Sequence, residues 1–277
     1  GSLHVACGGF RATIPGVSAG EFPPVATVNP KTKTVLDKEK IVDALSLVTF
    51  AASTDEGRPL LTGVKIKQHD GPTTLAATDG YRLSVKHLAH VTSEDLDLVV
   101  PARALLEVSK VSLEEKDVKQ IGMIKPGNGQ LVFVVGDTEV HTRLIDGEYP
   151  NFEKIIPSSH NTRVLLDKEK LSCAVRSAAV FARENANIIK FHIENQTVTV
   201  SANTPQVGEN QVDVEAKVDG EGGDIAFNSR FLLEFLANYK EEEVLFEMTG
   251  SLNSGVFRPV KDDSFLHIIM PVRVSSG

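Results

Sequence analysis

A pentapeptide near the start of the chain has the form of a catalytic nucleophile turn. Gly16–Gly20 reads Gly-Val-Ser-Ala-Gly and matches G-x-S-x-G, a pattern that places a serine on a sharp turn between a buried strand and a helix. Pro15 precedes the pattern and Phe22–Pro24 follow it, and the two prolines behind the serine forbid the helix that the turn requires. We therefore interpret this segment as a loop without a catalytic role.

Two other local patterns have the form of binding or modification sites. His87 and His90 are three residues apart, close enough to share a metal ion, and Asp95 is a third ligand candidate. No cysteine or second histidine pair accompanies them, so we interpret them as surface residues. Asn195–Thr197 has the form of a glycosylation sequon, but without a signal peptide it is only a hairpin turn. With no P-loop or dinucleotide fingerprint either, the sequence predicts no enzyme, no cofactor and no metal.

Basic residues on predicted helices form a third set, and their chemistry is the neutralisation of phosphates. Arg176 and Arg183 are seven residues apart and share a helix flank away from the apolar stripe. If the helices line one surface, the candidates for contact with nucleic acid are Arg103, Lys110, Arg176, Arg183 and Arg230. Such side chains neutralise phosphates without reading bases. For any one of them alone, a solvated helix face is the alternative interpretation.

The elements that would position these residues are duplicated. Val35–Ser53 and Leu165–Arg183 both contain Asp-Lys-Glu-Lys, and the two copies lie 130 residues apart. In each copy, Asp37 or Asp167 stands where a side-chain oxygen can cap a helix. Five apolar residues with the spacing of one helix face follow in both copies: Ile41, Ala44, Leu45, Val48 and Ala52, then Leu171, Ala174, Val175, Ala178 and Ala182. We infer an internal duplication, with an amphipathic helix in each copy.

Each copy also contains a second helix and groups of strands. Pro101–Glu107 and Asn228–Glu234 share Arg, Leu-Leu and Glu at an offset of 127 residues. Period-two patterns predict strands at Leu61–Lys67, Thr73–Ala77, Gln130–Val135 and Val140–Ile145, and then at Ile189–Ile193, Thr197–Ala202, Val244–Thr249, Gly255–Pro259 and Leu266–Pro271. The pattern indicates an α+β fold in which the helices lie on one face of antiparallel sheets.

The opening segment has the character of the end of a repeat. Leu3–Thr13 predicts one or two strands followed by a turn. Glu21–Pro23 is similar to Glu148–Pro150, again at an offset of 127 residues. The segment thus corresponds to the last strands of a repeat whose beginning is absent.

Composition limits the class of protein. The 277 residues suffice for two domains, and no apolar run approaches the ~20 residues that cross a bilayer. Cys7 and Cys173 form no disulfide framework, which favours a reducing cytosol. The net charge of −8 argues against a globally basic nucleic-acid coat. A local basic face is still compatible with it, because charges act separately beyond a screening length of ~8 Å.

Three motifs inside the duplication resemble one family. Ala77–Leu83 (ATDGYRL), Arg143–Phe152 (RLIDGEYPNF) and Ile269–Arg273 (IMPVR) are similar to the bacterial sliding clamps, the beta subunits of DNA polymerase III. The resemblance covers nearly the whole chain and implies DNA-clamp (processivity-fold) repeats, each with antiparallel sheets backed by two helices. The family carries three repeats per chain. The resemblance therefore implies the C-terminal strands of a truncated first domain at residues 1–27, a second domain at 28–155 and a third at 156–277.

The resemblance implies a function without chemistry. A sliding clamp is a polymerase processivity factor whose full-length homodimer forms a ring around duplex DNA and slides through sequence-independent contacts. The implied partners are duplex DNA, a replicative polymerase subunit, the clamp loader, and repair polymerases with ligase or mismatch-repair proteins. The implied location is the cytoplasm, at the nucleoid, with no membrane. The alternative is a repeat-built interaction module that binds peptides but not DNA.

The resemblance also implies a peptide-binding pocket between the second and third repeats. The matching positions are Leu61, Thr78, Gly80, Tyr81, Arg82, Leu83, Pro150, Lys154, Ile155, Asn228, Phe231, Leu252, Ser254, Ile268, Ile269, Met270, Pro271, Val272 and Arg273. Lys154 stands where the family often has arginine, which keeps the charge but loses the planar fork. Phe231 replaces a frequent tyrosine, and Ala186 falls where a large side chain can line the pocket, which predicts a more open wall.

Two further sets follow from the same resemblance. Arg58, in the loop before Leu61, joins the candidates for DNA contact, although Asp55 and Glu56 flank it. Val180 and Phe181 match the surface at which ring-forming chains meet. With most of the first repeat absent, we expect these two residues to be exposed and the chain not to form a stable ring.

Overall fold

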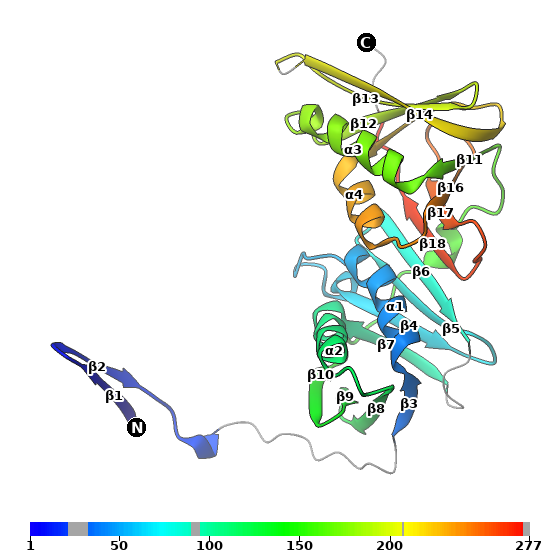
Figure 1. Ribbon diagram of the computed structural model, residues 1–277. Coiled ribbons are helices and arrows are strands. Elements are labelled where there is room, and N and C mark those ends of the chain that lie inside the picture. Colours follow the sequence, from blue (N-terminus) through cyan, green and yellow to red (C-terminus); the bar gives the residue numbers. More distant parts are fainter. Residues whose placement is uncertain (22–32, 90–94, 207, 274–277) are drawn as a thin grey trace.

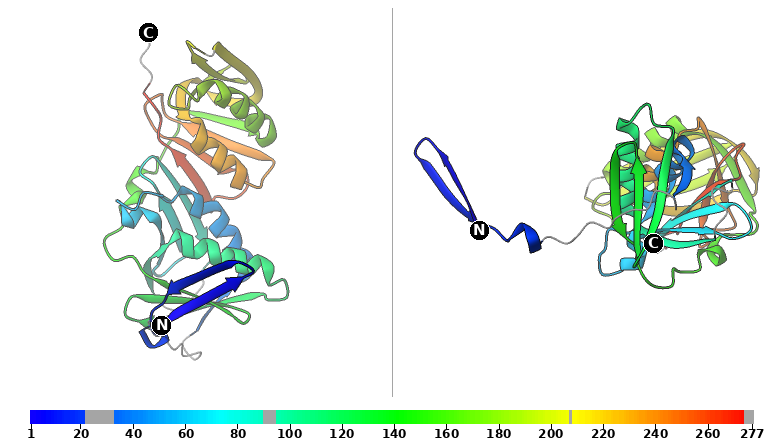
Figure 2. Two further views of the ribbon diagram at one scale, coloured as in Figure 1. Left: turned by 90° about the vertical axis from the view of Figure 1, so that its left-hand side faces the viewer. Right: turned by 90° about the horizontal axis from the view of Figure 1, so that it is seen from below.

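Two α+β units lie one above the other in the computed structural model, which describes residues 1–21, 33–89, 95–206 and 208–273 (Figure 1). Helices α1 (Lys38–Val48) and α2 (Ala102–Glu114) belong to the first unit, and α3 (Lys168–Ala182) and α4 (Ser229–Asn238) to the second. All four helices lie on one side of the sheets, as the side view in Figure 2 shows. The predicted arrangement, helices on one face of antiparallel sheets, is confirmed.

The strands of the first unit and of the opening segment have these bounds: β1 (Ser2–Cys7), β2 (Phe10–Pro15), β3 (Thr34–Asp37), β4 (Gly63–Gln68), β5 (Thr73–Thr78), β6 (Arg82–Leu88), β7 (Leu96–Pro101), β8 (Gln120–Gly127), β9 (Gln130–Val135) and β10 (Thr138–Arg143). Those of the second unit are β11 (Thr162–Asp167), β12 (Ile188–Glu194), β13 (Thr197–Thr204), β14 (Gly208–Gly220), β15 (Gly223–Asn228), β16 (Glu243–Met248), β17 (Gly255–Pro259) and β18 (Phe265–Ile269). They form a β1–β2 hairpin, a sheet in the order β10-β9-β8-β3, and a twelve-stranded sheet in the order β15-β12-β13-β14-β11-β16-β17-β18-β6-β5-β4-β7.

The duplicated helices begin at the predicted caps. The Asp37 carboxylate accepts a hydrogen bond from the Lys40 N–H at 3.0 Å, and the Asp167 carboxylate accepts one from the Lys170 N–H at 2.8 Å. Both sets of five predicted apolar residues are buried. Helix α1 ends earlier than its sequence pattern, because the Thr49 hydroxyl donates to the Leu45 carbonyl and a 3₁₀ turn, η3 (Thr49–Ala51), follows.

Some predicted strand boundaries need correction, and seven strands were not predicted. Strand β4 begins at Gly63 rather than Leu61, because Pro59–Thr62 forms a 3₁₀ helix, η4, whose first residue is a proline. Strand β10 ends at Arg143, and beyond it the Ile145 N–H bonds to the Val99 carbonyl instead of to β9. The strands that were not predicted are β3, β6, β7, β8, β11, β14 and β15. In the thirteen-residue β14, most of the side chains are exposed.

The two units share one continuous sheet. Strand β18 of the second unit pairs with β6 of the first, and five residue pairs run from Phe265 opposite Lys86 to Ile269 opposite Arg82. Three ion pairs support this junction: Lys86–Asp262 at 2.8 Å, Lys240–Asp43 at 2.6 Å and Arg82–Glu234 at 2.6 Å. The junction is therefore a backbone ladder and not merely a contact between side chains.

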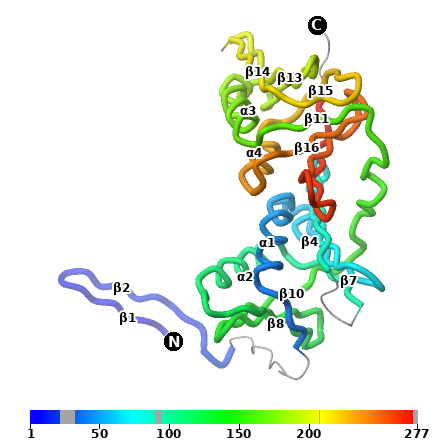
Figure 3. The backbone as a smooth tube through the Cα atoms, turned by 45° about the vertical axis from the view of Figure 1, so that its right-hand side comes forward, coloured from blue at the N-terminus to red at the C-terminus, as the bar shows by residue number. Residues whose placement is uncertain are grey.

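The helices cover one face of the shared sheet, and the segment that connects the two units packs on the other face. Alternate residues of β6 and β18 point toward the helices or away from them, as in any strand. On the outer face, Leu83 and Ile268 join Tyr149 and Phe152 in a hydrophobic cluster of their own. The segment after β10, residues 144–161, rises along the side away from the helices and connects the units (Figure 3). We call this segment the linker.

The opening hairpin confirms the predicted strands at Leu3–Thr13. A 3₁₀ turn, η1 (Ala19–Glu21), begins inside the nucleophile-like pentapeptide, and the described residues of this segment end at Glu21. The landmark at Glu21–Pro23 lies mostly outside the described residues. Within the described part of the chain, none of the helices combines the length and apolar character needed to cross a membrane.

Candidate functional site

A hollow opens on the outer face where the two units meet. Its volume is about 170 Å³, and residues of both units and of the linker line it. Nine of the lining residues are those predicted for the peptide pocket: Leu61, Thr78, Gly80, Arg82, Leu83, Pro150, Ile155, Ile268 and Met270. Asn151 and Phe152 also line it and were missed. We call this hollow the groove.

The wall of the groove contains a turn held by its own side chains. The Asp79 carboxylate accepts from the N–H groups of Tyr81 and Arg82 at 2.8 and 3.1 Å. The Thr78 hydroxyl donates to the Arg82 carbonyl and accepts from the Gly80 N–H. Gly80 has a φ of +95°, a conformation that favours glycine. The turn is therefore preformed.

Arg82 connects the groove to the helices of both units. Its guanidinium donates to Asp79 at 3.0 Å, to Glu234 of α4 at 2.6 Å and to the Phe50 carbonyl at 2.8 Å. It also lies 4.7 Å from the centroid of the Phe231 ring, a cation–π distance. Only 7% of the residue is exposed. Three different nitrogens donate in fixed directions, an arrangement that only the planar guanidinium of arginine offers.

The floor of the groove depends on a buried tyrosine. The Tyr149 hydroxyl accepts from the Thr78 N–H at 3.2 Å and faces the Gly63 carbonyl at 3.4 Å. Burial raises the pKa of Tyr149 to about 12, so the hydroxyl stays protonated. Tyr149 packs edge-on against Phe152, one of the two missed residues. The sequence signal for Phe152 was its place in the RLIDGEYPNF motif, of which it is the last residue.

A second group of predicted residues lies beside the groove without lining it. Tyr81 is 60% exposed and stacks on Phe231 with 6.3 Å between the ring centroids. Ser254 contacts the Met270 sulfur at 3.1 Å. Leu252 is exposed, and the Asn228 side chain caps α4 by accepting from the Arg230 N–H.

The remaining pocket candidates are not brought to the groove. Ile269 is fully buried and belongs to the core under the helices, because it alternates with Ile268 along β18. Lys154, in the 3₁₀ helix η5 (Phe152–Ile155), is exposed and does not line the groove. Pro271 and Val272 are half-buried and Arg273 is exposed, and the Val272 N–H bonds to the Ala226 carbonyl.

The basic candidates fall on the opposite side of the sheet. Arg103 and Lys110 are exposed on α2, Arg176 is exposed on α3, and Arg183 and Arg230 are exposed at helix ends. Among the described residues, no carboxylate forms an ion pair with any of these five. Arg58 differs, because its guanidinium bonds to Asp55 and to the Asp79 carbonyl at the rim of the groove.

The other predicted residues lie at the far end of the second unit. Val180 is 56% exposed on α3, and Phe181 is partly buried against the core of that unit. Ala186 is exposed at a φ of +49° in the turn after α3 and is absent from the lining of the groove. The prediction that Ala186 makes the wall of the pocket more open therefore does not apply to the groove.

The described residues of the metal-like pattern and of the glycosylation-like sequon have structural roles or hydrogen-bond partners of their own. His87 shares a hydrogen bond with Thr74, Asp95 pairs with His69, and His90 lies outside the described residues. Asn195 and Gln196 take positive φ values, as a two-residue hairpin turn requires. Across residues 1–21, 33–89, 95–206 and 208–273, no three His, Cys, Asp or Glu side chains are placed to hold a metal ion.

Comparison with known proteins identifies the family. Residues 35–151 match the central domain of the DNA polymerase III beta subunit, and residues 153–273 match its C-terminal domain. The chain is 30% identical over 280 residues to a beta sliding clamp of Synechococcus elongatus, covering 99% of this chain and 74% of that protein. It is 29% identical over 274 residues to the beta sliding clamp of Staphylococcus aureus strain Mu50, covering 97% of this chain and 71% of that protein.

Solved structures agree with the sequence matches. The beta chain of DNA polymerase III from Streptococcus pneumoniae superposes with a TM-score of 0.87 at 27% identity, covering 99% of this chain and 73% of that one. The beta subunit from Thermotoga maritima gives 0.86 at 25% identity, with 99% and 74% coverage. The chain belongs to the family of bacterial beta sliding clamps, the beta subunits of DNA polymerase III.

Proposed function

We propose that this chain works as two repeats of a sliding clamp, residues 28–155 and 156–277, which face duplex DNA with their helices and dock partner peptides in the groove. Membership of the family makes it a processivity factor and not an enzyme. The observation that carries the docking role is the groove itself, which both units and the linker line together. Its floor is apolar, and a few polar groups stand at its margin, as in other sites for short ligands.

Two exposed apolar side chains make the docking role testable. Ile155 is 45% exposed and Met270 is 43% exposed, and both line the groove. The probe is a labelled short peptide that begins with Gln and carries Leu and Phe near its end. We expect saturable binding that weakens at least about tenfold in an Ile155→Ser, Met270→Ala variant, since each truncation removes roughly 1–2 kcal/mol of apolar contact.

A matched control separates groove contacts from general apolar adhesion. Leu106 is 51% exposed on α2, on the helix side of the sheet. Leu106→Ala should leave peptide binding unchanged. Equal loss in both variants, or no binding by the unaltered chain, would show that the groove does not dock such peptides.

The helix face is the proposed surface for duplex DNA. Its five exposed cations are Arg103, Lys110, Arg176, Arg183 and Arg230, and none is neutralised by a carboxylate among the described residues. Fluorescence anisotropy of a labelled duplex across a salt series should show weak, sequence-independent binding that falls steeply with salt. Changing all five to Gln should flatten the salt slope. Binding that does not depend on salt or on these residues would favour an interaction module that never meets DNA.

The proposed partners follow from this function. The groove would take peptides of a replicative polymerase subunit, the clamp loader, and repair polymerases with ligase or mismatch-repair proteins. Such work is done at the nucleoid in the cytoplasm.

A further inference from the structure

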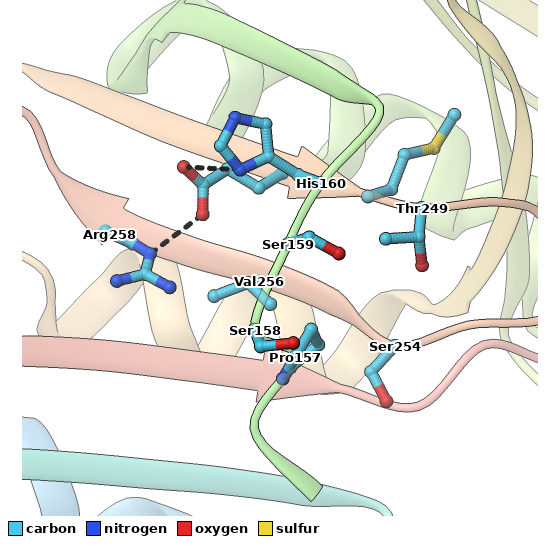
Figure 4. A pocket seen from close by; sticks show the side chains of 10 residues that line it. Pro157, Ser158, Ser159, His160, Thr249, Ser254, Val256 and Arg258 are labelled. Carbon is cyan, nitrogen blue, oxygen red and sulfur yellow. Dashed lines mark hydrogen bonds and ion pairs between the residues drawn. The ribbon is translucent and has the colours of Figure 1, made fainter.

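A second, smaller hollow lies beside the groove on the same outer face. Its volume is about 40 Å³, room for roughly three water-sized groups. Linker residues 157–160 form one wall, and residues of β16, β17 and the turn between them form the rest. Figure 4 shows the linker crossing in front of Val256, with Arg258 on one side of it and Ser254 and Thr249 on the other. We call this hollow the notch.

The strand register makes the notch a neighbour of the groove. Leu83 lies opposite Ile268, Ile268 opposite Val256, and Val256 opposite Glu247, so the four form one row across β6, β18, β17 and β16. The first two line the groove and the last two line the notch. Two strand spacings, about 10 Å, separate Ile268 from Glu247. Ser254 of the notch contacts the sulfur of Met270 of the groove at 3.1 Å, so the two hollows share a wall.

The charged side chains at and behind the notch have a positive balance, because Arg163 of β11, which does not line the notch, adds to Arg258 of its lining. Glu247 is its only carboxylate, is 4% exposed, and accepts from Arg163 through Nε at 2.9 Å and Nη2 at 2.6 Å. Its other oxygen accepts from Arg258 Nε at 2.9 Å, and His160 lies 3.6 Å from the carboxylate. Burial opposes ionisation, but the hydrogen bond from Arg163 and the charge of Arg258 hold the pKa of Glu247 below its usual value. Two guanidinium groups thus surround one carboxylate.

The polar groups of the notch have unused hydrogen-bonding capacity. The two Nη groups of Arg258 have no partner among the described residues, because only its Nε contacts Glu247. The hydroxyls of Ser158 and Ser159 point toward the side on which Ser254 and Thr249 lie (Figure 4). A ligand that accepts hydrogen bonds and carries negative charge fits this lining. A carboxylate has three heavy atoms, which is also the number of water-sized groups that the volume admits.

We propose that the notch is a specificity subsite for the docked peptide and takes an acidic side chain. An extended peptide advances about 3.3 Å per residue, so the acidic residue would stand about three positions from the apolar side chain on Ile268. The inference rests on the docking function proposed above and adds a charge preference to it. Arg258 supplies the positive field, and the serines of the linker supply hydrogen bonds.

The test compares two peptides that differ only at that position, one with Glu and one with Gln. Unaltered chain should bind the Glu peptide about two- to fivefold more tightly at low salt, the range expected for a partly exposed ion pair, and the preference should shrink as salt is added. Arg258→Gln should abolish the preference, and Arg258→Lys should retain it. Ser159→Ala, a change in the exposed linker, should reduce it without affecting folding.

The control is Lys190→Gln, which removes an exposed charge from β12, in the second unit and away from the notch. It should leave the preference intact. Equal affinities of the unaltered chain for the two peptides would refute the acidic subsite but not the docking of peptides in the groove. A preference that survives both Arg258→Gln and Ser159→Ala would overturn it as well. Failure of both peptides to bind would instead overturn the docking function on which the subsite rests.

Discussion

Replacing Arg82 with alanine should destabilise the chain more than any surface change on the same sheet. The guanidinium has three hydrogen-bond partners and lies over the rings of Phe231 and Phe50, and its side chain is 7% exposed. Asp79, with 12% of its side chain exposed, would be left as a nearly buried carboxylate, and breaking such a pair costs about 3–5 kcal/mol. The Glu234 pair adds less than about 1 kcal/mol, since half of that side chain is in water.

The expected loss is therefore about 4 kcal/mol, a large part of the ~5–15 kcal/mol that stabilises a typical domain. Urea unfolding followed by circular dichroism measures it. Arg82→Lys should recover only part of the loss, because one ammonium cannot reach three separate acceptors in fixed directions. Glu234→Gln should cost below about 1 kcal/mol, which assigns most of the effect to Asp79 and the Phe50 carbonyl.

The control for this series is Arg230→Ala, an exposed arginine on α4, which should stay within about 0.5 kcal/mol of the unaltered chain. An Arg82→Ala loss below about 1 kcal/mol would refute the reasoning, since it would mean that Asp79 is satisfied by its two backbone N–H partners alone.

Three further results are expected. Although partial burial raises it, hydrogen bonds from Lys86 and Ser264 lower the pKa of Asp262 to about 2, so this carboxylate stabilises the fold above pH ~4 and the contribution is lost as pH falls toward 2. In thermal unfolding, Lys86→Gln should cost about 1 kcal/mol at neutral pH and clearly less at pH 2, where about half of Asp262 is protonated; a constant difference would contradict the ion pair. Tyr149→Phe should cost about 1–2 kcal/mol in urea unfolding, because it leaves the buried Thr78 N–H unpaired, and an unchanged midpoint would show that water replaces the hydroxyl. Gly255→Ala should cost about 1–3 kcal/mol, since a Cβ there would stand 2.5 Å from the Phe227 ring; a neutral result by calorimetry would mean that the ring moves freely.

The features of the fold that the sequence predicted correctly are those determined by residues close together in the chain. The caps at Asp37 and Asp167, the two apolar helix stripes and the hairpin turn at Asn195 depend on residues a few positions apart. The thirteen-residue β14 was missed because its apolar residues, Val212, Val214, Ala216 and Val218, are few and of moderate size and alternate with exposed polar residues, so that the apolar signal is weak. Pairing of β6 with β18 joins residues more than 170 positions apart, and the composition of neither strand specifies its partner.

The groove was predicted through motifs and not through geometry. Nine of the residues that the resemblance implied line the groove, whereas Ile269 does not, because the alternation along β18 turns it into the core. Asp79 is a near neighbour of Arg82, but the Phe50 carbonyl and Glu234 lie 32 and 152 positions away, so the central position of Arg82 could not be deduced from spacing. The notch was not predicted for the same reason, since its charge balance depends on the lateral register of β11, β16 and β17.

The ladder between β6 and β18 also decides how the two units respond to mechanical load. A force along the strands acts on all five residue pairs at once, in shear, and every hydrogen bond between the strands must lengthen together. A force that separates the strands from one end opens the pairs one after another and meets far less resistance at any moment. The joint is thus strong against sliding and weak against peeling, so a partner that pries open the edge of the groove at Met270 would part the two units with the least work.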